Sequence, residues 1–162
     1  MMNKLAKSIT LAVSLLVMTN AQAGVSEVTW SNPDKYRDVD VGEGHRAKFK
    51  ARVFAEFEQH FAKLASQLPE GQTLKIVVKD VDLAGDVNHG GMHRIRVVKE
   101  LFYPRLKFSY QLLDGNQQLL SSDEINLTDM NFMLGARLKY HNDQLSYEKR
   151  MLDDWFADTF NQ

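Results

Sequence analysis

The chain has 162 residues, 44% of them hydrophobic and 25% charged, which is the composition of a globular domain with one core. Its 20 Lys and Arg are balanced by 21 Asp and Glu, and this lack of a basic excess argues against nucleic-acid binding, which depends on neutralising phosphates. The absence of cysteine excludes disulfides, cysteine nucleophiles and a lipid-modified cysteine.

The first 23 residues have the three parts of a secretory signal peptide. Two lysines precede an apolar run at 9–18, and Ala21 to Ala23 form a small-x-small cleavage motif. The run is shorter than the about 20 residues that a membrane-spanning helix needs. We therefore expect a single domain at 24–162, in the bacterial periplasm and without a transmembrane segment. Cleavage lowers the Lys and Arg count from 20 to 18 against 21 acids, a net charge of −3.

The domain is expected to open with a short strand at 25–30, where β-branched and aromatic residues are frequent. Residues 31–34 contain Asn32-Pro33 and end it in a turn. The next stretch, 35–44, is charged and contains glycine. It predicts a solvated loop with no chemistry of its own.

Residues 46–68 change to helical periodicity, and Pro69 ends the helix. An apolar stripe this wide must be buried, so we interpret it as core rather than as a cofactor site. His60 lies at the edge of the stripe and is expected to keep its polar tip in water. The stripe consists of Phe49, Val53, Phe57, Phe61, Leu64 and Leu68.

The stretch 74–85 is the most strand-like in the chain and is expected to be an interior strand, because apolar side chains alternate onto both faces. In a regular strand, Asp80 and Asp82 would share a face with Ile76 and Val78. Either the strand ends near Lys79, or a bulge shifts the carboxylates to the other face.

Two metal sites are conceivable after this strand. Asp80 and Asp82 occupy positions one and three of an EF-hand calcium loop, but Gly91 stands at position twelve, where a glutamate is required. His89 and His93 have the helical zinc spacing and could be joined by Asp86, but two glycines between the histidines argue against a helix. The alternative is that both aspartates end the strand through side-chain to backbone hydrogen bonds.

The second half of the domain begins with 94–102, which fits either a strand or a helical turn. Residues 105–113 alternate clearly, Asp114-Gly115 is a turn signal, and 117–126 should return antiparallel. A connecting segment follows. The last helix can be capped by Asn142 or Asp143. Its inward face is expected to carry Leu145, Met151, Leu152, Trp155, Phe156 and Phe160.

These elements predict an α+β domain with a single-layer, mostly antiparallel sheet in the order β-α-β-(β)-β-β-α. Both helices are expected on one face of the sheet. The chain has no G-x-S-x-G nucleophile elbow and no phosphate-binding glycine loop.

Four motifs resemble a bacterial secreted family known as domain of unknown function 3016. They are D-V-D-L-A-G at 80–85, Y-P-R at 103–105, L-T-D-M-N-F-M at 127–133 and Y-E-K-R-M-L-D-D-W-F at 147–156. The family usually has two prolines after the tyrosine, whereas this chain has one. The resemblance implies secretion and a single domain, and it supplies no catalytic residues.

Two functional hypotheses follow. The first is a non-catalytic binding or adaptor domain of the cell envelope, with another periplasmic or envelope protein as its partner and no cofactor. The second is a metal-binding protein or small hydrolase-type enzyme with a carboxylate cluster at the end of the central strand. The candidate binding residues are Asp80, Asp82, Asp86, Asp129 and Arg105, and the candidate metal ligands are His89 and His93.

Overall fold

The computed structural model describes residues 23–90, 93–134, 140 and 143–160. The signal-peptide prediction falls on residues outside this part, apart from Ala23, and so does Asn142 as a helix cap. No helix in the described ranges is long and apolar enough to cross a membrane.

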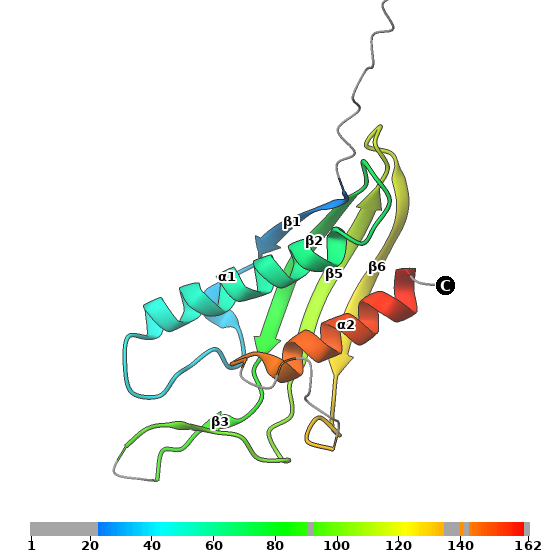
Figure 1. Ribbon diagram of the computed structural model, residues 1–162. Helices are drawn as coiled ribbons and strands as arrows, with labels where there is room; N and C mark the ends of the chain where they lie inside the picture. Colours follow the sequence, from blue (N-terminus) through cyan, green and yellow to red (C-terminus); the bar gives the residue numbers. More distant parts are fainter. Residues whose placement is uncertain (1–22, 91–92, 135–139, 141–142, 161–162) are drawn as a thin grey trace, which may run out of the picture.

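Four strands form one twisted sheet in the spatial order β1-β2-β5-β6 (Figure 1). β1 (Val25–Trp30) runs parallel to β2 (Thr73–Asp82), while β5 (Arg105–Leu113) and β6 (Leu119–Thr128) are antiparallel to their neighbours. The parallel pair needs a crossover connection, and a helix supplies it. The mostly antiparallel sheet of the predicted fold class is thereby confirmed.

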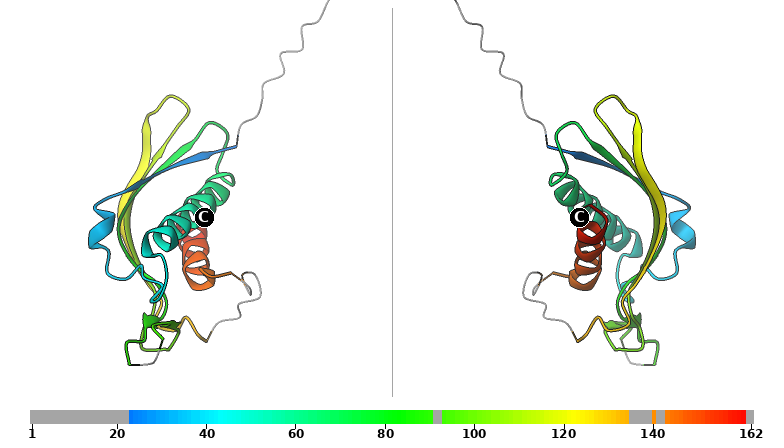
Figure 2. Two further views of the ribbon diagram at one scale, coloured as in Figure 1. Left: turned by 90° about the vertical axis from the view of Figure 1, so that its left-hand side faces the viewer. Right: turned by 90° about the vertical axis from the view of Figure 1, so that its right-hand side faces the viewer.

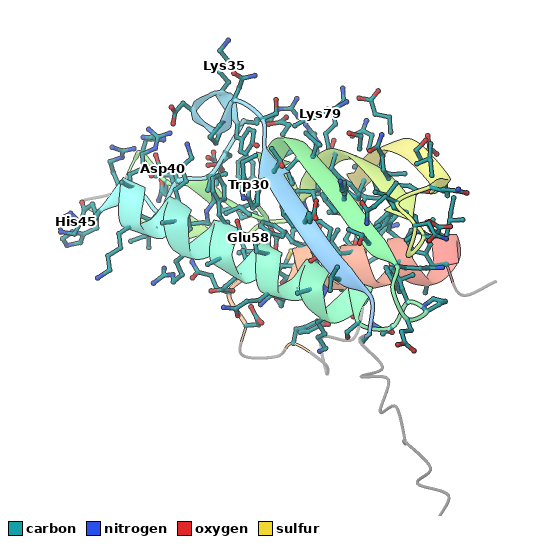
Figure 3. The ribbon with its side chains drawn as sticks, turned by 90° about the horizontal axis from the view of Figure 1, so that it is seen from above. Trp30, Lys35, Asp40, His45, Glu58 and Lys79 are labelled. Atoms are coloured by element: carbon teal, nitrogen blue, oxygen red, sulfur yellow. The ribbon has the colours of Figure 1, made fainter. Side chains whose placement is uncertain are left out.

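The two helices are α1 (Arg46–Ala65) and α2 (Ser146–Phe160), and both lie on the concave face of the sheet (Figure 2). A short 3-10 helix, η1 (Pro33–Lys35), follows β1. The opposite face of the sheet is polar: Lys79 projects there, away from the helices (Figure 3), and pairs with Glu124 of β6. The prediction of two helices on one face of an α+β sheet is therefore confirmed.

The core lies between the sheet and the two helices and is rich in aromatic rings. Phe57 and Phe61 of α1 and Phe108 of β5 are fully buried, which confirms the apolar stripe as core. The Phe108 ring meets the edge of Trp155 of α2 at a centroid distance of 4.8 Å. At the border of the core, the Trp30 indole N–H donates to Glu58 at 2.8 Å, where β1 and α1 face each other (Figure 3).

β2 contains a bulge between Val78 and Asp80, which decides between the two alternatives for this strand. The extra residue lets Val81 stay buried in the core, and Asp80 and Asp82 therefore project from the opposite face. The strand runs through both carboxylates. The strand continues past Asp80 and ends at Asp82, so only the second aspartate stands at its end.

A two-stranded arm extends from the end of the sheet (Figure 1). It consists of β3 (Asp86–Val87) and β4 (Arg96–Val97), so the ambiguous stretch 94–102 contains a very short strand. Gly85 opens the arm with a φ of 87°, and a Cβ there would lie 2.7 Å from the carbonyl oxygen of Val97. Only glycine fits this turn without strain.

His60 of α1 is buried against α2. His60 is 4% exposed, and its Nε2 lies 3.0 Å from the Asp153 carboxylate of α2, so the predicted wet tip is wrong. Burial lowers the pKa of His60, and the Asp153 charge opposes this change.

At the C-terminal end of α1, a Cβ on Gly24 would lie 2.5 Å from the carbonyl oxygen of Ala65, so the chain enters β1 in close contact with the helix.

Candidate functional site

A polar pocket of about 420 Å³ lies where β2 ends, between the loop after β1 and the arm. Several parts of the chain meet there: the loop, the first residue of α1, the last residue of β2, the arm, and the segment that leads into the start of β5. We call this the polar pocket. Its polar lining residues are Arg37, Asp38, Asp40, Arg46, Asp82, Asp86, His89, Tyr103 and Arg105.

The loop reaches the pocket because it continues the parallel pairing of β1 beyond the strand itself. The Asp38 N–H donates to the carbonyl of Val81 at 3.1 Å, and the Leu83 N–H donates to the carbonyl of Asp38 at 3.1 Å. The Tyr36 hydroxyl donates to the carbonyl of Val78 at 2.9 Å. The prediction of a solvated loop is therefore wrong, because these bonds hold the loop beside β2 and bury Tyr36 and Val39.

Asp82 is the central acid of the pocket. Its carboxylate lies 3.5 Å from the guanidinium of Arg37 and 3.6 Å from that of Arg105. Burial raises the pKa of Asp82, and the two guanidiniums offset part of that rise. Arg105 also stacks over the ring of Tyr103 at 4.3 Å. The pair of arginines therefore fixes one carboxylate between two positive charges.

Arg96 ties the arm to the rest of the pocket. Its Nη2 lies 2.6 Å from the Asp38 carboxylate, and its Nε donates to the carbonyl of Asp40 at 3.0 Å. Burial raises the pKa of Asp38, and the charge of Arg96 opposes that rise. Nη1 of Arg96 donates to the carbonyls of Leu83, Ala84 and Gly85 at 3.3, 3.3 and 2.8 Å. One nearly buried guanidinium thus holds the loop, the arm and the end of β2 together.

A second buried charge supports the same turn from the helix side. The Glu148 carboxylate of α2 accepts the N–H of Ala84 at 2.7 Å. Burial raises the pKa of Glu148. The side chain is fully enclosed, so it positions the backbone and is not a group that a ligand can reach.

Four of the residues predicted as binding or metal candidates meet in the polar pocket, namely Asp82, Asp86, His89 and Arg105. Asp80 does not line it, but its carboxylate accepts the N–H of Arg37 at 2.9 Å and so positions the arginine that does.

The other two candidates lie elsewhere. Asp129 pairs with Arg150 at 2.7 Å in a groove beside α2, and His93 lies 3.2 Å from Glu43, so it does not join His89 in the pocket lining. Across the described ranges, no three His, Asp or Glu side chains are grouped so as to hold a metal ion.

Sequence reasoning missed the contribution of the loop to the pocket, namely Arg37, Asp38 and Asp40. The only signal is the alternation of charge in R-D-V-D-V at 37–41, which has the period of a strand. It also missed Arg96, since no motif contains it. These residues become a site only through pairing with a strand that lies more than 30 residues later in the chain.

The segment that supplies Leu101 to the polar pocket carries further exposed apolar side chains. Leu101 lines it and is 77% exposed, and Ile95 and Val98 lie in the same segment with 56% and 41% of their surface exposed. Large apolar groups exposed on one segment are typical of a contact surface. We call the pocket and these three residues the arm face.

Chemically, the polar pocket offers hydrogen bonds and charges of both signs. Three of its four aspartates, Asp38, Asp40 and Asp82, each have an arginine within 4 Å. The pKa of Asp40 is lowered. Burial acts to raise this pKa, but the N–H of Gly42 and the positive charge of Arg46 outweigh that effect. Carboxylates paired in this way suit recognition of a polar surface better than proton transfer.

A family model described as Protein of unknown function (DUF3016) matches residues 24–158. The match spans the sheet, the arm and most of α2, and therefore includes the whole polar pocket. No curated protein and no solved structure matches the chain.

Proposed function

The chain belongs to the DUF3016 family, and from that premise we propose that it is an exported, non-catalytic domain that binds another protein of the bacterial cell envelope. The signal-peptide pattern of residues 1–23 supports a periplasmic location. The arm face is the surface through which the domain binds its partner.

The observation that carries this proposal is the position of Leu101. Its side chain is almost fully exposed and lines the same pocket as Asp82 and its two arginines. An apolar group beside arginines is the composition of a protein contact surface, where arginine is enriched and apolar side chains supply the buried centre. A partner that covers Leu101 also removes water from the Asp82 ion pairs, which strengthens its own polar contacts with them.

The proposal can be tested in living cells with a photo-crosslinking amino acid at Leu101. We expect a discrete crosslinked product that contains one envelope protein, and we expect Arg105→Ala to reduce its yield. The matched control is the same amino acid at Gln111, an exposed position of β5 away from the arm. Equal products from both positions, or none from Leu101, would contradict the assignment of the arm face.

A further inference from the structure

We propose that the groove between β6 and α2 binds an extended segment of a partner protein, rich in basic and apolar residues, which pairs with β6 as a fifth strand. This groove is separate from the polar pocket. The proposal therefore stands or falls independently of the partner at the arm face.

The first observation is the open backbone of β6. β6 is the last strand in the sheet order, and no strand of the described part pairs with its outer side. Its residues 121–128 pair one for one with 105–112, without a bulge. The strand contains no proline and no lysine, the residues that commonly protect an edge from further pairing. Along these eight regular residues, every second one directs its backbone groups away from β5, toward the place that a further strand would take.

The hydrogen-bond pattern identifies which groups point outward. The Asp129 N–H donates to the carbonyl of Pro104 at 3.3 Å and so continues the β5–β6 ladder. Since alternate residues of an antiparallel strand bond to the same side, Leu127 and Ile125 face β5, and Asn126 and Thr128 direct their N–H groups away from it. The Glu124 N–H fits this alternation, because it bonds to the Asp123 carboxylate at 2.7 Å instead of to β5.

The second observation is the groove of about 660 Å³ that lies beside this edge. Its apolar lining comes from Leu127 of β6, Leu134 of the connecting segment, and Met151 and Trp155 of α2. Because the side chains of a strand alternate between the faces of a sheet, every second residue of a strand added to β6 would project toward α2. These positions of the bound segment are the apolar ones.

The charge of the groove selects the rest of the segment. Among the residues that the structure describes, the groove is lined by the carboxylates of Asp129, Asp154 and Asp158 and by the guanidinium of Arg150, which pairs with Asp129. A segment that carries lysine or arginine is therefore complementary, and an acidic one is repelled.

The third observation concerns Trp155, which is only 6% exposed. Its indole N–H is buried and has no hydrogen-bond partner among the residues that the structure describes. A buried indole N–H normally finds an acceptor, because leaving it unpaired is costly. Because the N–H is enclosed in this structure, an oxygen of a bound segment could supply that acceptor only if the surrounding side chains moved.

The test uses a synthetic peptide of eight residues in which lysine and valine alternate, with blocked ends and a fluorescent label. We expect saturable binding by fluorescence anisotropy, and slower amide hydrogen exchange at Asn126 and Thr128 when the peptide is bound. A peptide of the same pattern with glutamate in place of lysine should not bind. No saturable binding of the lysine peptide at millimolar concentration would overturn the proposal.

Two variants separate strand pairing from charge. Asn126→Pro removes one outward N–H and leaves the ladder to β5 intact, and Asp154→Asn with Asp158→Asn removes two charges. Each of these variants should weaken peptide binding about tenfold or more. The control is Glu27→Gln with Glu70→Gln, which replaces two acids remote from the groove and should leave peptide binding nearly unchanged. Unaltered binding by Asn126→Pro would overturn strand addition. If that variant fails to fold, the exchange of the β6 amides in the unaltered protein decides.

Discussion

The Glu148 carboxylate accepts the backbone N–H of Ala84 at 2.7 Å, although the two residues are 64 positions apart in the chain. This contact joins the first turn of α2 to the turn that follows β2. Burial raises the pKa of Glu148 above its ordinary value of 4.5. The ionised carboxylate is therefore less favourable in the folded protein than in the unfolded chain, although its hydrogen bond helps to position the turn.

Glu148→Gln should keep the acceptor for Ala84 and remove the buried charge. A carboxyl whose pKa is raised on folding contributes stability that is present below the unfolded pKa and is lost as the pH rises through the folded pKa. The variant should therefore gain in stability relative to the unaltered protein as the pH rises from 4.5 to 8, measured by urea unfolding. Glu148→Ala, the control, should lose about 1–3 kcal/mol because the Ala84 N–H is left unpaired. A gain that shrinks with rising pH would refute this account.

Phe57→Ala and Trp155→Ala should each lower the free energy of unfolding by about 3–5 kcal/mol, because each removes a large buried ring and leaves a cavity. The matched control is Leu119→Ala, whose side chain is mostly exposed and which should change stability by no more than about 0.5 kcal/mol. Denaturant midpoints measure all three. Equal midpoints for Phe57→Ala and Leu119→Ala would show that the core lies elsewhere.

Asp80→Asn and Asp82→Asn should each change stability by about 1 kcal/mol or less. Asparagine keeps an acceptor for the nearby arginines, and the raised pKa of Asp82 shows that its charge is already disfavoured by burial. Added Ca²⁺ or Zn²⁺ should leave the melting temperature unchanged, since only a ligand that prefers the native state raises it. A metal-dependent rise that Asp82→Asn abolishes would instead support a metal-binding protein.

Arg96→Met should destabilise the protein by about 2–4 kcal/mol, because it leaves the partly buried Asp38 carboxylate and several carbonyls without their donor. Arg94→Met is the control: its side chain is about half exposed, and its guanidinium lies 4.0 Å from the Asp40 carboxylate. That change should cost no more than about 0.5 kcal/mol. Urea unfolding compares the two, and similar losses would mean that Arg96 is not the residue that holds the arm.

Export predicts that the mature protein begins at Gly24. Intact-mass measurement of the protein from the periplasmic fraction should give the mass of residues 24–162. Retention of Met1 in that fraction would contradict both the cleavage and the proposed location.

Local patterns were sufficient for the helices and the hairpin. The apolar stripe of α1 has a period that depends only on neighbouring residues, and Asp114 forms the expected turn by accepting the N–H groups of Asn116 and Gln118. The β2 alternation likewise revealed that the strand must end or bulge, although only the structure shows the bulge.

The polar pocket could not be predicted in the same way. Arg37 and Asp38 reach Asp82 only because α1 carries the chain back into a parallel pairing, and such pairing has no signal within a short window of sequence. His60 shows the same limit. It lies at the border of its own helix stripe, and it contacts Asp153 of α2, 93 positions later. Both the polar pocket and the burial of His60 depend on contacts between elements that are far apart in the sequence.

If residues 1–23 are removed as we propose, the close approach of Gly24 to the end of α1 makes the cleaved and uncleaved chains differ in stability. Cleavage after Ala23 would create a new ammonium group on Gly24, beside the last carbonyls of the helix, where positive charge is favourable. The uncleaved chain lacks this charge, so its folded state would be slightly less stable than that of the mature domain. A less stable precursor remains easier to unfold for translocation, and release of the leader would then favour the folded state on the far side of the membrane.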